Sequence, residues 1–157
     1  MAVARRLLDK YRQEYQPEAL SLTTGKPTIC SAALPGYPAH LANDRRRRDT
    51  NRYWATDITQ DKAAWWQVDL EKPTTIARIV VVFYYGDKRH YGFTVETSTD
   101  AKTWQIAADH LDNTELSTPA GVTVRFTPRP ARYIRIILTS NSANTGRRLV
   151  EVMAYDK

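Results

Sequence analysis

The chain of 157 residues has one cysteine, six glycines and no long apolar segment. The single cysteine, Cys30, excludes an internal disulfide and a zinc site built from several cysteines. No apolar run approaches the roughly 18–20 residues that a transmembrane helix needs, which argues against an integral membrane protein. Cys30 lies in an apolar-leaning segment, and we expect it to be a buried structural thiol.

Catalytic motifs are also missing. The three histidines, His40, His90 and His110, form no H-E-x-x-H pattern, and no G-x-S-x-G nucleophile motif or glycine-rich phosphate loop occurs. Paired catalytic carboxylates have no fixed sequence spacing, so that class of enzyme stays open at this point. A small domain without a catalytic signature is more often a binding module, and the sequence therefore predicts a non-enzyme.

Positive charge is abundant and concentrated. The net charge is +6, and residues 44–52 hold five arginines and two aspartates, a local charge of +3. The run Arg45-Arg46-Arg47-Arg48 is either a solvated loop or a site for carboxylate, sulfate or phosphate groups, which match the fork of an arginine. Binding of an acidic polymer there would weaken with salt. No nucleic-acid-binding motif supports a nucleic-acid partner.

Two parts of the chain differ in pattern. Residues 1–19 carry apolar residues at near-helical spacing up to Pro17, which predicts a short N-terminal helix or a linker. They lack the continuous apolar region of a signal peptide. From residue 20 onward, short runs rich in Val, Ile, Thr, Tyr and Phe alternate with Pro and Gly turns. Residues 79–83 are continuously apolar, as in a strand buried on both faces. We expect an all-β antiparallel sandwich over residues 20–157.

The order of motifs in this part resembles the F5/8 type C, or discoidin, domain, and most of all the family 32 carbohydrate-binding modules of bacteria. The motifs are Ala-Asn-Asp at 42–44, YWATD at 53–57, WQVDL at 66–70, FTVETS at 93–98, ARYIR at 131–135 and VEV at 150–152. The resemblance implies a galactose-binding-like jelly roll and a non-catalytic module that targets an attached, secreted enzyme to glycans. It also implies an extracellular location for the parent protein.

Several motif residues are expected to serve the fold. Trp66 and Trp104 are predicted to pack in the core, and Tyr133 and Arg135 to support the sheet. Asp69 interrupts an apolar strand, so its carboxylate is expected to bond a neighbouring turn.

Three loops, at residues 34–54, 84–91 and 140–148, carry groups suited to binding a sugar. The apolar face of a sugar packs on an aromatic ring, and its hydroxyls form hydrogen bonds. The loop at 84–91 is the main candidate. The candidate ligand-binding residues are Tyr84, Tyr85, Arg89, His90, Tyr91, His40, Trp54, Asn144 and Arg147. Tyr84 alternatively packs at the end of a strand, and Trp54 alternatively closes a loop onto the core.

The resemblance further implies a structural Ca²⁺ ion, because many members of the family hold one. Asp44, Asp49, Thr50 and Glu151 occur in a suitable order for this oxygen-ligand site. The four consecutive arginines oppose it by like charge. Two other functions remain open, a structural domain that packs against a catalytic partner and a discoidin-type domain that binds anionic membranes. The loop tips offer Tyr, Arg and Pro in place of paired Leu or Phe, which disfavours the membrane alternative.

Overall fold

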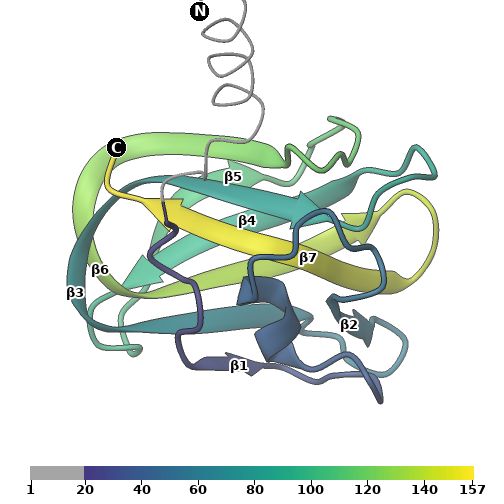
Figure 1. The fold of residues 1–157 in the computed structure, drawn as a ribbon, viewed down its shortest axis with the longest axis horizontal. Coiled ribbons are helices and arrows are strands. Elements are labelled where there is room, and N and C mark those ends of the chain that lie inside the picture. Colours follow the sequence, from purple (N-terminus) through teal and green to yellow (C-terminus); the bar gives the residue numbers. More distant parts are fainter. Residues whose placement is uncertain (1–19) are drawn as a thin grey trace, which may run out of the picture.

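Two long strands with alternating or continuously apolar residues organise the structure (Figure 1). The computed structural model describes residues 20–157, so the predicted N-terminal helix or linker at 1–19 lies outside the described residues. The elements are β1 (Thr28–Cys30), η1 (Ala39–Asn43), β2 (Trp54–Asp57), β3 (Trp65–Phe83), β4 (Tyr91–Ser98), β5 (Gln105–His110), β6 (Val122–Asn141) and β7 (Gly146–Tyr155). The helical element η1 is a 3₁₀-helix that the sequence did not predict. The part of the chain that the structure describes has no helix long and apolar enough to cross a membrane.

All strand pairs are antiparallel, in the order β2-β7-β3-β6-β4-β5, with β1 on β3. Each of the two long strands takes part in both layers. The first half of β3 pairs with the second half of β6, as Val68 with Ile134, and the second half of β3 pairs with the first half of β6, as Val81 with Val122. The strands curve between these halves, where the register shifts after Asp69 (Figure 1). The predicted all-β antiparallel sandwich is confirmed.

The bend replaces a predicted turn. Lys72-Pro73 is one of the Pro-containing segments that the sequence predicts as turns, and a strand bend or bulge accommodates such a segment equally well. Glu71 has a φ of +74°, and β3 continues through it. The two predicted strands at 66–70 and 79–83 are therefore one strand.

The core lies between the two layers. Trp66 and Val68 point into it from one half of β3, and Ile79 and Val81 point into it from the other. Trp66 is fully buried, and its indole N–H donates to the carbonyl of Ala39 at 2.9 Å. Both the core position of Trp66 and the complete burial of residues 79–83 are confirmed.

One core prediction is wrong, and another is met in part. Trp104 is half-buried and lies outside the core, with the Arg135 guanidinium 4.1 Å from its ring centre and 4.7 Å from that of Trp65. The chain leaves β4 in a turn before Trp104, so the ring reaches the outer face of the sheet. Arg135 also donates to Gln67, which supports its predicted scaffold role. Cys30 is half-buried and packs against the core, and desolvation raises the pKa of its thiol, so its predicted burial is met in part.

Asp69 has the role that its sequence context predicted. Its carboxylate accepts the Glu71 amide at 2.7 Å, closing the turn at the bend. It also pairs with Arg132 at 2.9 Å, and these contacts hold the pKa of Asp69 below its usual range.

Close packing at the start of β6 generates a prediction. Gly121 has a φ of +76°, and a Cβ there would lie 2.8 Å from Cγ1 of Val80. Gly36 has a φ of +86°, but a Cβ there meets nothing within 4 Å. Both alanine substitutions carry backbone strain, and only Gly121→Ala adds overpacking of about 1–3 kcal/mol. Urea unfolding should show the larger loss of stability for Gly121→Ala, and equal losses would contradict this packing.

Candidate functional site

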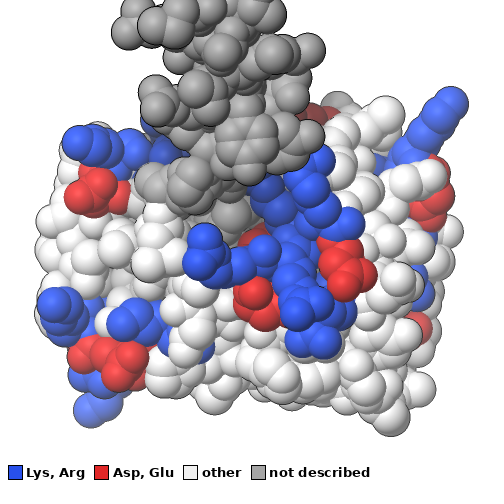
Figure 2. Space-filling model, in the orientation of Figure 1, with Lys and Arg blue, Asp and Glu red and all other residues white. Residues whose placement is uncertain are grey.

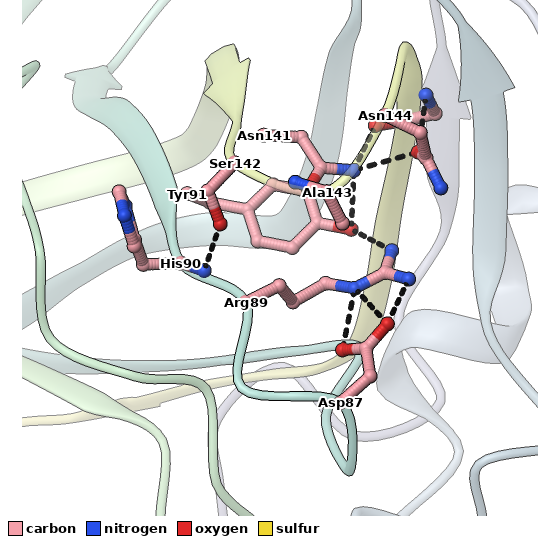
Figure 3. A network of polar contacts seen from close by, with 9 residues as sticks. Asp87, Arg89, His90, Tyr91, Asn141, Ser142, Ala143 and Asn144 are labelled. Carbon is pink, nitrogen blue, oxygen red and sulfur yellow. Dashed lines mark hydrogen bonds and ion pairs between the residues drawn. The ribbon is translucent and has the colours of Figure 1, made fainter.

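Arg89 connects the loop after β3 to the core (Figure 3). Gly86, with a φ of +109°, and Lys88, with a φ of +60°, turn the chain so that the side chain of Arg89 points inward. Its guanidinium forms a bidentate ion pair with Asp87, including an Nε contact of 2.8 Å, and Nη1 donates to the Tyr91 hydroxyl at 3.2 Å. The same group lies 4.6 Å from the ring centre of Tyr84.

These contacts give Arg89 and Tyr91 a structural role. Arg89 is only 5% exposed, and Tyr91 is fully buried against Phe83, with ring centres 4.8 Å apart. Pairing with Asp87 raises the pKa of Arg89, and Arg89 lowers the pKa of the Asp87 carboxyl. The prediction that Arg89 and Tyr91 contact a ligand directly does not fit this burial, because the network consumes the groups that a sugar would need.

His90 and Asn144 lie on either side of this network (Figure 3). The backbone amide of His90 donates to the Ser142 hydroxyl at 2.9 Å, and the Ser142 amide returns a bond to the His90 carbonyl. Asn144 is exposed and accepts bonds from the Gly146 amide and from Asn141, which also reaches the Tyr91 hydroxyl. These bonds join the loops at 84–90 and 142–145. His40 is exposed on η1 and shares no hydrogen bond with the other candidates.

Trp54 and Arg147 are also structural. Trp54 is fully buried, and its indole N–H donates to the Ala32 carbonyl at 3.0 Å, so the loop-closing alternative holds. Arg147 is 6% exposed and donates to four backbone carbonyls. Both side chains are buried, which does not fit the prediction that they contact a ligand.

The remaining candidates, Tyr84 and Tyr85, belong to a surface that the sequence did not reveal. We call Tyr37, Tyr53, Tyr84 and Tyr85 the tyrosine cluster, which covers the outer side of the β2-β7-β3 layer. The Tyr37 and Tyr53 rings stack at 4.6 Å, and the Tyr53 and Tyr84 rings meet edge to face at 5.5 Å. Burial and the Tyr37 hydroxyl raise the pKa of Tyr53 to about 12, so its hydroxyl remains a proton donor at physiological pH.

Arg148 lies over the tyrosine cluster and was missed at the sequence level. Its guanidinium is 5.5 Å from the ring centre of Tyr53 and 5.1 Å from that of Tyr84. Within residues 20–157, Arg148 has no carboxylate partner and donates no hydrogen bond. Strand alternation was the available signal, because Arg147 and Arg148 must point to opposite faces.

The arginine loop, residues 44–52, adjoins this cluster. The Tyr85 hydroxyl donates to the Arg47 carbonyl at 3.1 Å, and Tyr53 follows Arg52 directly. Arg45, Arg46 and Arg48 are exposed. Figure 2 shows Lys and Arg side chains gathered near the middle of one face of the molecule, with Asp and Glu side chains beside them. The tyrosine cluster therefore lies beside a loop that has a net charge of +3.

The predicted calcium ligands do not form a set that fits a cation. Glu151 is 1% exposed, and its two oxygens accept the amides of Asp44 and Arg45 at 3.1 and 2.7 Å. Asp49 accepts the Asn51 amide. Burial raises the pKa of Glu151 to about 8, and the two amide donors act in the opposite direction. No group of three His, Cys, Asp or Glu side chains in the described part of the chain converges to hold a metal. Calcium binding by Asp44, Asp49, Thr50 and Glu151 stays a prediction.

One loop tip departs from the sequence expectation. Leu111 and Leu116 are exposed in the segment after β5, where no apolar tip was expected. Asp109, Asp112 and Glu115 surround them in the sequence. This negative charge opposes contact with an anionic membrane, so these two leucines do not support the membrane-binding alternative.

The fold and this surface define a β-sandwich module with loops and one outer face suited to binding. Comparison with known families gives its class, since the F5/8 type C domain matches residues 28–152. The chain therefore belongs to the F5/8 type C domain family, and the resemblance seen in the sequence is confirmed.

Curated relatives are larger proteins. The chain is 38% identical over 118 residues to the BTB/POZ domain-containing protein 9 of Bos taurus. The matched region covers 73% of this chain and 19% of that protein. The protein of the same name from Homo sapiens is 36% identical over 118 residues. The chain thus spans about a fifth of the length of these relatives.

Solved structures with the same fold include carbohydrate-binding modules. The family 32 module of AlyQ, in complex with 4,5-unsaturated mannuronic acid, has a TM-score of 0.71 and 24% identity, covering 83% of this chain and 95% of that one. A pectin-binding module has a TM-score of 0.67 and 23% identity, covering 82% and 88%. A family 89 glycoside hydrolase from Clostridium perfringens has a TM-score of 0.75 and 23% identity over 88% of this chain and 15% of that one. At these identities the similarity establishes the fold.

The structural role of Arg89 generates a prediction about pH. Because Arg89 lowers the pKa of Asp87, the ion pair stabilises the fold above the ordinary aspartate pKa and is lost as pH falls through the lowered value. Arg89→Met should lower the free energy of unfolding at pH 7 by about 1–3 kcal/mol. The difference from the parent should shrink below about pH 4. Urea titrations across pH measure this, with Lys88→Met as the exposed control, and a pH-independent difference would contradict it.

Proposed function

We propose that this chain is a non-catalytic binding module for acidic glycans, and that the ligand's carboxylate lies on Arg148. The supporting observation is a half-buried guanidinium held over two tyrosine rings with no acidic partner among the described residues. A cation removed from water needs a counter-charge, and an external anion supplies one.

The groups around Arg148 fit a uronate residue of a polysaccharide. A guanidinium accepts a carboxylate through two parallel N–H bonds, and the exposed part of an aromatic ring packs on the apolar face of a sugar. Tyr37 and Tyr84 are half-exposed, and the tyrosine hydroxyls add donors. The arginine loop attracts further carboxylates along the chain, so an acidic polymer gains more than a single sugar.

Two of the similar solved structures support this ligand class. The AlyQ module is described with an unsaturated mannuronic acid, and the second module is described as pectin-binding. AlyQ also carries an alginate lyase domain. By the same reasoning, we propose that the module binds to substrate on behalf of an attached enzyme and acts outside the cell, where such polymers are exposed.

Binding affinity tests the role of Arg148. An oligomannuronate and a neutral mannose oligomer of equal length should be titrated calorimetrically into the parent chain and into Arg148→Met. Loss of a charge-assisted contact should weaken binding of the acidic oligomer roughly 10–100-fold, and added salt should weaken binding to the parent. The neutral oligomer should bind weakly and equally to both.

Arg129→Met is the matched control, because Arg129 also lies over an aromatic ring, 5.1 Å from the centre of Phe126, and the net charge changes equally. It should bind the acidic oligomer as the parent does. Equal affinities of the Arg148→Met and Arg129→Met variants would reject Arg148 as the carboxylate site. No binding of the parent to any uronate oligomer would reject the proposed function.

A different surface favours a second candidate function, packing against a partner domain. One register row crosses the outer face of the other layer, through Ile29, Gln67, Arg135, Glu96 and Ile106. The isoleucines at its ends are 57% and 61% exposed. These two exposed isoleucines could each pack against a partner domain that covers this face of the sheet.

Substitution of one end residue tests this candidate. Ile106→Lys should change the thermal midpoint of the isolated chain little, as most surface substitutions do. With its neighbouring domains attached, the same substitution should lower the midpoint and increase protease sensitivity. Thr127→Lys, at an exposed position on β6, is the control. Identical behaviour of the two variants would reject the contact surface.

A further inference from the structure

The carboxylates that the family resemblance assigns to calcium already have donors of their own. Both oxygens of Glu151 accept backbone amides, from Asp44 at 3.1 Å and from Arg45 at 2.7 Å. Asp44 accepts the Arg46 amide at 3.1 Å with one oxygen and Nε of Arg52 at 3.0 Å with the other. Three consecutive amides and one guanidinium therefore point at the two carboxylates.

This arrangement has the polarity opposite to that of a cation site. A calcium ion is surrounded by oxygen lone pairs, usually from carboxylates and backbone carbonyls. Here backbone N–H groups donate to Glu151. The Arg52 guanidinium pairs with an Asp44 oxygen that a metal ion would need as a ligand. A divalent ion at this place would have to displace these donors and approach several arginines of like charge.

We infer that the amides of Asp44, Arg45 and Arg46 and the Arg52 guanidinium anchor the arginine loop to Glu151 and Asp44 in place of a divalent cation. The loop and its positive surface therefore form without calcium. This inference is independent of the proposed glycan function, because it concerns how the loop is held and not what the loop binds.

Two further features agree with an internal anchor. Glu151 lies in β7 and is buried, so the anchor connects the exposed arginines to the sheet itself. Arg45 has a φ of +68°, a conformation that costs a non-glycine residue energy, and its amide bond to Glu151 offsets that cost. The bond uses the backbone, so it constrains the loop without using the arginine charge.

Thermal unfolding in calcium and in chelator tests the inference. The chain should be unfolded with millimolar CaCl₂ and with EDTA at the same pH and ionic strength. We expect the same midpoint in both, whereas a site saturated by calcium would raise the midpoint by several degrees. Amide hydrogen exchange in EDTA should show protection at Asp44 and Arg45, because their amides are bonded to a buried carboxylate.

Glu151→Gln should lower the midpoint by several degrees and remove the protection of at least one of the two amides, since its side-chain NH₂ group cannot accept a bond. Glu115→Gln, at an exposed glutamate, is the control and should behave as the parent does. A calcium-dependent rise that vanishes in Glu151→Gln would overturn the inference. Unprotected amides at Asp44 and Arg45 in EDTA would also overturn it. The measurements on the parent chain decide the matter if Glu151→Gln does not fold.

Discussion

The antiparallel pairing of β3 with β6 runs through both layers of the sandwich. The remaining strands extend this pair. Strands β1 and β7 pair with β3, and β4 pairs with β6, while β2 pairs with β7 and β5 pairs with β4. Because both long strands curve from one layer into the other, a single pairing encloses the core between its own two halves. The same geometry brings the loop after β3 next to the loop between β6 and β7, where Arg89, Tyr91 and Asn141 connect them.

Strand alternation then separates an arginine that bonds the fold from one whose N–H groups could bind a ligand. Arg147 and Arg148 are neighbours in β7, and their side chains point to opposite faces. Arg147 is enclosed by backbone carbonyls, whereas Arg148 lies on two tyrosine rings with its N–H edge free of acceptors among the described residues. Residue type alone does not distinguish Arg147 from Arg148. Their burial distinguishes them, because Arg147 is buried and Arg148 is half-buried.

The all-β fold class could be predicted because it depends on local patterns of apolar and turn residues. The run at 66–70 alternates apolar and polar residues and the run at 79–83 is continuously apolar, and both patterns are typical of strands. The series of motifs indicates the F5/8 type C family. The candidate site was less predictable, because its contacts join residues far apart in the sequence. Trp54 reaches Ala32, Tyr85 reaches Arg47, and Glu151 reaches Asp44, and no local pattern encodes these pairs. Sequence analysis chose Arg89 and Arg147 as candidate ligand contacts, and the structure shows both guanidinium groups buried and bonded within the fold.

The central claim is that an acidic glycan binds where Arg148 lies on the tyrosine cluster. Its most direct test is NMR detection of the arginine Nε–H groups and tyrosine rings during titration with an oligomannuronate. The account predicts that the largest shifts occur at Arg148, with smaller shifts at Tyr37 and Tyr84 and none at Arg147. Shifts confined to His90 and Asn144, with Arg148 unchanged, would contradict it.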